Sequence, residues 1–368
     1  MKYDFLIVGA GFAGSVMAER IASQLNKKVL IVEKRNHIGG NAYDEYDEHG
    51  ILVHKYGPHI FHTNSKMVFD YISQFTEWRF YEHKVLAKIK DELYPIPINR
   101  ITINKLYNKN FQSAYEVKNY FEKVREKRYP IKNSEDIIIN QVGVDLFEKF
   151  FKYYTQKQWS LEPRELSAQV CGRIPVRLND DCRYFTDKYQ YMPKEGYTKM
   201  FERMLKHNNI EVILNTDYKK IIEDIEFNKM IYTGPIDYFF DYRFGKLPYR
   251  SIRFEFENLG VENFQESAVI NYVEEMVQYT RVTEYKYLSG QKSNSTTISY
   301  EYTEKEGEPY YPVPTDINRE LFLRYKLETQ KIKNVIFCGR LAEYQYYNMD
   351  QAAANSLKKF RELLNDGK

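Results

Sequence analysis

The chain has 368 residues, of which 43% are hydrophobic and 29% are charged, and its formal net charge is +3. This is the composition of a globular protein with a large core and room for two or three domains. The small net charge argues against a nucleic-acid partner held by bulk attraction, so we expect none. No stretch approaches the roughly 20 apolar residues of a membrane-spanning helix, so we expect no membrane span.

The three cysteines, Cys171, Cys182 and Cys338, are odd in number and too far apart to form a CxxC ligand pair. This spacing argues against a disulfide framework and a structural metal, and we expect buried thiols and no metal site. The N-terminus carries an acid before a short apolar run that enters glycines at once, unlike a signal peptide. We therefore expect a cytoplasmic protein.

The N-terminal segment has the pattern of one βαβ unit. Residues 5–8 are a continuous apolar run, typical of a buried parallel strand, and glycines follow it. Apolar residues at helical spacing then continue to Leu25, and residues 29–33 predict a second strand. Further on, Asn64 is expected to cap a helix that runs through Phe75.

The pattern changes to helices from about residue 101 to 159. Residues 111–129 are highly charged, with apolar residues three and four apart, and Ser134 opens a long helical stretch through Phe151. We expect a separate small bundle here.

Alternating polar and apolar residues dominate the following region. Period two recurs over residues 252–257, 268–273, 279–287 and 296–302, which predicts an antiparallel sheet with one solvated face. Residues 335–339 return to a buried parallel strand, and a last helix is expected over residues 350–364.

These elements predict an α/β fold with α+β inserts, in which a Rossmann-type domain is assembled from both ends of the chain. We assign residues 1–80, 190–245 and 318–368 to this discontinuous Rossmann-type domain. Residues 98–165 form the helical domain. Residues 81–97, 166–189 and 246–317 form the antiparallel sheet domain.

Residues 9–14, Gly-Ala-Gly-Phe-Ala-Gly, form a GxGxxG motif between the first strand and helix. Gly9 permits the tight turn, Gly11 lets a pyrophosphate approach the backbone, and Gly14 lets helix and strand pack closely. Glu33 follows at about the 20-residue spacing expected for the ribose ligand. A dinucleotide site is the favoured interpretation over a glycine-rich turn without a ligand.

A second glycine pair, Gly39-Gly40 followed by Asn41, lies soon after Glu33. This arrangement resembles the extended fingerprint of FAD-binding oxidoreductases and amine oxidases. No second GxGxxG occurs, so we expect no built-in NAD(P)H domain and an external electron donor.

Several longer segments closely resemble the bacterial UDP-galactopyranose mutase family, and the resemblance runs over essentially the whole chain. The matching segments are residues 33–42, 55–63, 154–159, 173–177, 232–237, 240–245 and 339–344.

The resemblance implies an FAD enzyme that interconverts UDP-galactopyranose and UDP-galactofuranose for cell-surface polysaccharide synthesis. It implies that N5 of the reduced flavin acts as nucleophile on the anomeric carbon, without net redox change. It also implies an arginine clamp for the diphosphate, and a homodimer.

The resemblance assigns catalytic roles to Arg173, Arg281 and His59. The cofactor-binding residues that it implies are Gly9, Gly11, Phe12, Gly14, Glu33, Lys34, Gly40, Asn41, His59, Ile60, Gly339, Arg340, Met349, Asp350 and Gln351. The substrate-binding residues are His83, Phe150, Tyr154, Thr155, Trp159, Arg173, Tyr184, Arg250, Arg281, Tyr310, Tyr311, Arg340 and Tyr346, with Tyr154 and Trp159 as the uridine wall of a mobile lid.

Two positions depart from the family pattern. Asn348 stands where the family commonly has aspartate, and Pro58 stands where related enzymes often have alanine. These departures leave open a preference for the N-acetylated sugar nucleotide. A true FAD oxidase or dehydrogenase of the amine-oxidase type, and a non-catalytic nucleotide-binding protein, are the alternative functions.

Overall fold

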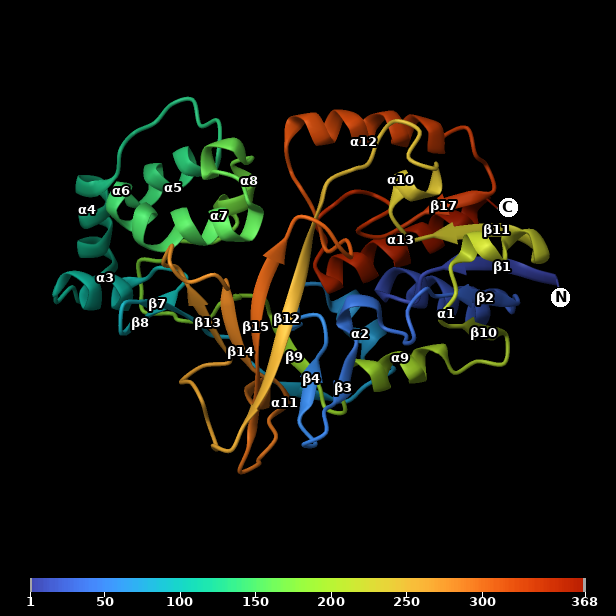
Figure 1. The fold of residues 1–368 in the computed structure, drawn as a ribbon, viewed down its shortest axis with the longest axis horizontal. Helices are drawn as coiled ribbons and strands as arrows, with labels where there is room; N and C mark the ends of the chain where they lie inside the picture. The colour runs from blue at the N-terminus through green and yellow to red at the C-terminus, as the bar shows by residue number, and fades with distance from the viewer. Residues whose placement is uncertain (1, 367–368) are drawn as a thin grey trace.

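The structure, a computed structural model, describes residues 2–366. A helical lobe lies at one end of the molecule, a large sheet in the middle, and a helix-covered parallel sheet at the other end (Figure 1). This arrangement confirms the predicted fold class: a Rossmann-type unit with a helical insert and a second sheet.

The parallel sheet has the strand order β10-β2-β1-β11-β17. Every neighbouring pair in it is parallel, so its C-terminal strand joins the N-terminal βαβ unit as predicted. Its strands are β1 (Lys2–Val8), β2 (Val29–Val32), β10 (Ile210–Ile213), β11 (Glu226–Tyr232) and β17 (Val335–Phe337).

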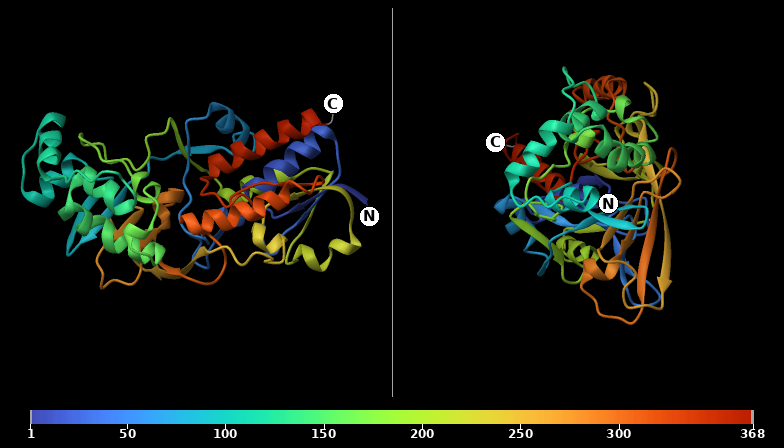
Figure 2. Two further views of the ribbon diagram at one scale, coloured as in Figure 1. Left: turned by 90° about the horizontal axis from the view of Figure 1, so that it is seen from above. Right: turned by 90° about the vertical axis from the view of Figure 1, so that its left-hand side faces the viewer.

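Both faces of this sheet are covered, which explains the continuous apolar runs over residues 5–8 of β1 and 29–32 of β2. On β1, Phe5 and Ile7 pack with α1 and with Phe360 of α13, whereas Leu6 and Val8 pack on the opposite side with Tyr218. Figure 2 shows α13 lying alongside α1. The helices of this part are α1 (Phe12–Leu25), α2 (Lys66–Ile72), α9 (Tyr197–Leu205), α10 (Ile236–Phe239), α12 (Asp316–Thr329) and α13 (Met349–Asp366).

The start of α2 differs from the prediction. Ser65, not Asn64, caps the helix, because the Ser65 side chain accepts a hydrogen bond from the Val68 amide. Asn64 instead donates its side-chain N–H to Asp187 at 2.5 Å. The helix ends at Ile72, before the predicted Phe75.

A seven-stranded sheet occupies the middle of the molecule, in the order β16-β12-β15-β14-β13-β7-β8. It is antiparallel as predicted, except that β7 pairs with β13 in parallel. The predicted strand over 279–287 is shorter, because the chain turns into α11 (Tyr285–Ser289) after β14. Its strands are β7 (Val85–Ile89), β8 (Glu92–Ile96), β12 (Tyr249–Leu259), β13 (Val269–Tyr272), β14 (Arg281–Glu284), β15 (Thr296–Glu304) and β16 (Tyr311–Pro312).

The helical lobe is the predicted bundle, with one interruption. Gly143, at φ +84°, breaks the predicted continuous helix after residue 134 into two. A π-helical turn, Glu148–Lys152, then leads into α7. The helices are α3 (Arg100–Tyr107), α4 (Ala114–Val124), α5 (Ser134–Val142), α6 (Val144–Phe147), α7 (Tyr153–Trp159) and α8 (Gln169–Gly172).

Two small sheets complete the fold. β3 (Asp44–Tyr46) pairs with β4 (Leu52–His54), and β9 (Tyr189–Pro193) lies between β5 (Phe61–Thr63) and β6 (Trp78–Phe80).

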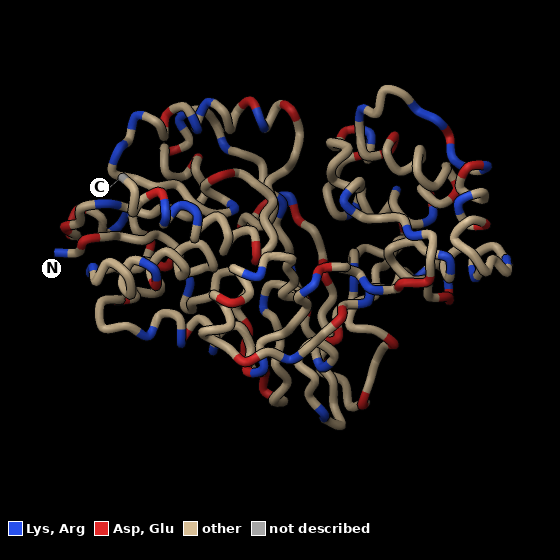
Figure 3. Tube along the Cα trace, turned by 180° about the vertical axis from the view of Figure 1, so that it is seen from behind, with Lys and Arg blue, Asp and Glu red and all other residues tan. Residues whose placement is uncertain are grey.

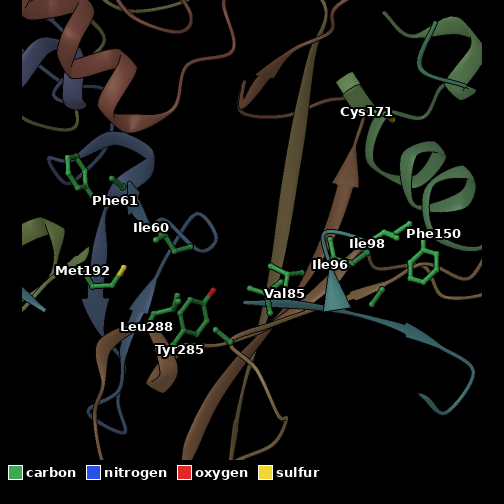
Figure 4. Packing of buried hydrophobic residues seen from close by; sticks show 14 of the residues in the cluster. Ile60, Phe61, Val85, Ile96, Ile98, Phe150, Cys171, Met192, Tyr285 and Leu288 are labelled. Carbon is green, nitrogen blue, oxygen red and sulfur yellow. The ribbon is translucent and has the colours of Figure 1, made fainter. Parts of the chain in front are cut away.

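One hydrophobic cluster joins the parts of the molecule. It extends from Phe61 and Met192 through Tyr285 and Val85 to Phe150 in the helical lobe (Figure 4). Since the packing is continuous, the lobe and the sheets are held in a defined relation where the site lies.

Charged side chains of both signs are interspersed along the chain (Figure 3). Within residues 2–366, no helix combines the length and apolarity that crossing a membrane would require. Cys171 and Cys338 are buried as predicted, but Cys182 is only half-buried, which corrects the expectation for that thiol.

Candidate active site

The turn between β1 and α1 has no room for a side chain at Gly9 or at Gly14. Gly9 has φ +101°, and a Cβ added there would lie 2.2 Å from Thr233 Oγ1. A Cβ on Gly14 would lie 1.9 Å from the Gly9 carbonyl oxygen. The glycines therefore bring the N-terminus of α1 up to the strand ends, which leaves its free amides available to an anion.

Glu33 closes the second strand beside this turn. Its carboxylate accepts hydrogen bonds from the Ala10 amide at 2.8 Å and from the Arg35 amide at 2.9 Å. Arg35 in turn donates to Asn41 Oδ1 at 3.0 Å, and its guanidinium lies 4.2 Å from the Tyr56 ring centroid. Arg35 thus links Glu33 to the segment of the second glycine pair through hydrogen bonds on both sides.

A cavity of about 1250 Å³ opens at this turn. It is larger than the roughly 300–1,000 Å³ of typical ligand pockets, as a dinucleotide requires. Eleven of the predicted cofactor residues line it: Gly9, Gly11, Phe12, Glu33, Lys34, Gly40, Asn41, His59, Gly339, Arg340 and Met349. Met349 is the first residue of α13.

The remaining predicted cofactor residues do not line this cavity. Gly14 packs against the Gly9 backbone, and Ile60 is buried in the hydrophobic cluster. The Gln351 side chain, in the first turn of α13, accepts a hydrogen bond at 2.9 Å from the amide of Asn348, which precedes the helix. Asp350, in the first turn of α13, has a buried Oδ1 without a hydrogen-bond partner among residues 2–366.

His59 lines the cavity as a neutral ring with a defined tautomer. Burial lowers the pKa of His59 to about 3. Its Nδ1 lies 2.8 Å from the Gly57 carbonyl oxygen, which can only accept, so Nδ1 carries the proton. Nε2 therefore keeps a lone pair, and the ring can accept a hydrogen bond there but cannot act as an imidazolium acid.

Arginines and tyrosines from distant segments meet next to this cavity. The Arg173 guanidinium lies 4.6 Å from the Tyr346 ring centroid, and Tyr346 stacks on Tyr311 at 5.2 Å. Arg281 donates from Nη2 to the Tyr154 hydroxyl at 2.8 Å. We call Tyr154, Arg173, Tyr184, Arg281, Tyr311, Arg340 and Tyr346 the arginine–tyrosine cluster.

The cluster carries a positive field. Burial by itself would raise the pKa of Tyr346, but Arg173, Arg340 and Arg281 outweigh it and hold that pKa below its usual range. Stabilisation of a phenolate means that the same position stabilises other anions, such as a diphosphate.

Arg340 belongs to both regions, and Trp159 of the large cavity lies beside the cluster. Each lines the large cavity; Arg340 lies 5.5 Å from the ring centroids of Tyr311 and Tyr346, and the Trp159 ring lies 6.4 Å from that of Tyr311. A group bound in the large cavity can therefore reach a ligand held by the cluster.

The other predicted substrate residues surround the cluster or lie apart from it. Phe150, Tyr154, Thr155, Trp159 and Arg173 border a small cavity of about 40 Å³. Arg250 is buried and lines the large cavity with the predicted cofactor residues. Tyr310 is buried and accepts a hydrogen bond at its carbonyl from Arg340 at 3.3 Å.

His83 is buried beside Tyr184, at 5.7 Å between ring centroids. Burial, reinforced by the nearby Arg281, lowers the pKa of His83 to about 3. A second cation next to Arg281 is thereby avoided.

Glu301 and Glu308 are among the residues of the site that escaped the sequence analysis. Glu301 on β15 faces Arg281 on β14, with 3.2 Å between Oε1 and Nε. It lies in a strand with alternating polar and apolar residues, where a charged side chain is expected on the solvated face and gives no signal of its own. Glu308 pairs with Lys34 at 2.8 Å across the cavity mouth, and nothing in its local sequence marks it.

Among residues 2–366, no group of three or more histidine, cysteine, aspartate and glutamate side chains has an arrangement that could hold a metal ion.

A model of the UDP-galactopyranose mutase family matches residues 149–346, and a Rossmann-like NAD(P)-binding model matches residues 7–75. A probable UDP-galactopyranose mutase from Klebsiella pneumoniae is 39% identical over 98% of this chain and 94% of its own length. The chain belongs to the UDP-galactopyranose mutase family.

This membership confirms the sequence-based resemblance and the predicted isomerase class. Another relative, a dTDP-fucopyranose mutase from Escherichia coli, is 37% identical over 94% of each chain. A crystal structure of a reduced UDP-galactopyranose mutase matches the fold with a TM-score of 0.80 at 15% identity, covering 99% of this chain and 96% of that one. A putrescine oxidase shares the fold more loosely, with a TM-score of 0.59 at 12% identity and 99% of each chain covered.

Proposed function

We propose that this member of the UDP-galactopyranose mutase family interconverts UDP-galactopyranose and UDP-galactofuranose with a reduced FAD. One observation carries the proposal: the dinucleotide cavity and the cationic arginine–tyrosine cluster share Arg340, and Trp159 of the cavity lies 6.4 Å from Tyr311 of the cluster. A redox cofactor alone would not require a diphosphate clamp beside it.

The residues of the large cavity fit a flavin dinucleotide. Gly9 and Gly14 have no room for side chains and Gly11 carries none, so a pyrophosphate can contact the backbone at the N-terminus of α1. Glu33 lies where ribose hydroxyls would bind, and the start of α13 offers a second helix N-terminus. When bound and reduced, the flavin supplies N5 as a nucleophile toward the anomeric carbon.

Arg173 and Arg281 hold the diphosphate while the bond between it and the sugar breaks and re-forms. Two guanidinium groups neutralise the charge that develops on the leaving phosphate oxygen, and they keep UDP in place for its return. Glu301 and the Tyr154 hydroxyl fix the Arg281 guanidinium from two sides. His59 accepts a hydrogen bond at Nε2 and so orients a donor of the cofactor or the sugar.

The direct test incubates dithionite-reduced, FAD-loaded protein with UDP-galactofuranose and follows the anomeric NMR signals. We expect conversion to UDP-galactopyranose by the reduced protein and none by the oxidised protein. Inactivity of the reduced protein would refute the proposal.

The dTDP-fucopyranose mutase relative makes a second nucleotide sugar a specific candidate. Parallel reactions with UDP-galactose, UDP-N-acetylgalactosamine and dTDP-fucose, each compared by kcat/KM, assign the preferred base and sugar. We propose UDP-galactose as the preferred substrate, with the N-acetylated sugar as a second one. A higher kcat/KM for dTDP-fucose would reassign the chain.

Two other functions give different results in the same assay. Bleaching of the flavin by an amine, without any nucleotide sugar, would indicate an amine-oxidase-type enzyme. UDP binding without turnover in either redox state would indicate a binding protein.

We further propose an external electron donor, since the sequence has a single GxGxxG motif. A homodimer in the cytoplasm, with residues 98–165 as the substrate-side lid, is proposed on the family resemblance. Light scattering of the purified protein tests the dimer.

A further inference from the structure

The side chain of Lys157, on α7, ends in a cage of backbone oxygens. Its Nζ donates to the carbonyl oxygens of Tyr272 at 2.6 Å, Glu274 at 3.0 Å, Val277 at 2.9 Å and Tyr279 at 3.2 Å. One oxygen belongs to Tyr272, the last residue of β13, and the other three to the loop that leads to β14; we call residues 272–279 the 272–279 turn.

An ammonium group is the natural occupant of such a cage. It has three N–H donors, so three of the four oxygens take one each and the fourth shares a proton. The four carbonyl dipoles point their negative ends at one place and repel each other without a cation between them. The conformation of the 272–279 turn therefore depends on a charged side chain that comes from the helical lobe.

The turn leads directly into the arginine–tyrosine cluster. Tyr279 precedes Arg281 by two residues, and the Thr280 amide between them bonds to the Glu301 carbonyl at 2.8 Å. On the other side of the cage, Tyr154 lies on the same helix as Lys157 and accepts the hydrogen bond from Arg281. Thr303 of β15 also donates its hydroxyl to the Lys157 carbonyl.

Figure 1 shows α7 next to the ends of β13 and β15. The Lys157 side chain thus joins the helix that carries Tyr154 and Trp159 to the strand end and loop that lead to Arg281, in addition to the hydrogen bonds made by Thr303 and Tyr154. We infer that Lys157 is a positioning residue for the diphosphate site: it docks α7 on the 272–279 turn and so sets Tyr154 against Arg281. This inference rests on the proposed role of Arg281 in binding the diphosphate.

Lys157 is half-buried and is not among the residues lining either cavity described above, so its effect is exerted through the residues it holds. An arginine could not replace it well, because a planar fork does not match four oxygens arranged around one point. The position therefore demands lysine for its geometry rather than for charge alone.

The test compares FAD-loaded parent protein with Lys157→Met and Lys157→Gln, using UDP as the probe in calorimetric titrations. Lys118→Met, on the exposed surface of α4, is the matched control. We expect normal flavin content, a UDP affinity that is weaker by about tenfold to a hundredfold for Lys157→Met, a smaller loss for Lys157→Gln, and no loss for the control. Hydrogen exchange should accelerate in residues 153–160 and 272–281 and stay unchanged in residues 7–40.

Three results would overturn the inference. The first is a folded Lys157→Met protein whose UDP affinity stays within about twofold of the parent. The second is a lower melting temperature with unchanged affinity, which would make Lys157 merely structural. The third is failure of both variants to fold. If the parent protein does not bind UDP, the proposed function fails. In that case, hydrogen exchange in residues 272–281 that is the same in Lys157→Met as in the parent would refute the docking of α7 by Lys157.

Discussion

Acidification from pH 7.5 to 5.0 should destabilise the protein through two buried histidines. His54 and His83 are only 2% and 4% exposed, and burial lowers the pKa of each to about 3. In the unfolded chain both rings titrate near the ordinary value of about 6.5. The unfolded state therefore binds more protons throughout the window between these values, so stability is complete above pH 6.5 and is lost as the pH falls.

The size of the effect follows from this difference. At pH 5.0 each ring costs ~2 kcal/mol relative to pH 7.5, and the two together cost ~4 kcal/mol. This is a large share of the roughly 5–15 kcal/mol by which most domains are stable. His54 contributes although it does not line the large cavity, because its Nδ1 must remain unprotonated to accept the His59 amide at 3.0 Å.

Urea unfolding curves at the two pH values measure the loss. His59, whose pKa burial also lowers to about 3, and other groups titrate in the same range. The decisive quantity is therefore the difference in unfolding free energy between the two pH values, measured for each variant. His54→Gln keeps an acceptor and His83→Gln keeps a polar group, and each should reduce the difference by ~2 kcal/mol. The exposed His49→Gln serves as the control. An undiminished pH difference in His83→Gln would show that its ring is not held neutral, and the reasoning would be wrong.

Three further predictions concern the site. Gly14→Ala should lose most bound FAD and destabilise the protein by ~1–3 kcal/mol, because the new Cβ would lie 1.9 Å from a backbone oxygen. Absorbance at 450 nm measures the bound flavin, and melting curves measure the stability. The control is Gly260→Ala, where an added Cβ would meet no atom within 4 Å. Arg281→Ala should lose most turnover while flavin content stays normal, and loss of flavin together with turnover would mean that Arg281 is wrongly assigned. Tyr154→Phe removes the acceptor for Arg281 Nη2 and should weaken UDP binding by about tenfold in calorimetry; an unchanged dissociation constant would show that this bond does not orient the guanidinium.

Local features of the sequence were sufficient to predict the structure around the glycine turn. This turn, the first two strands of the parallel sheet and Glu33 lie within about 30 residues of each other, and the need for glycine follows from backbone sterics. The arginine–tyrosine cluster was different. An isolated arginine or tyrosine carries no signal of its own, and the family resemblance was what selected Arg173, Arg281 and Tyr346.

Other features could not be predicted because their partners are distant or are backbone atoms. The parallel pairing of β7 with β13 joins segments about 180 residues apart, and period two does not distinguish parallel from antiparallel neighbours. The capping of α2 by Ser65 instead of Asn64 depends on Asp187, which takes the Asn64 side chain. Lys157 reads as one more charged residue on a helix, since all its acceptors are carbonyl groups.

These distant contacts determine the chemistry that the site can support. The guanidinium of Arg281 is held by Glu301 from β15 and by Tyr154 from α7, and α7 is itself held through Lys157. The large cavity opens beside the parallel sheet, whereas the arginine–tyrosine cluster takes Tyr154 from the helical lobe and Arg281 from the seven-stranded sheet. Substitutions at the contacts between these parts should therefore change the affinity for the nucleotide sugar while leaving flavin binding intact, which separates the two halves of the site experimentally.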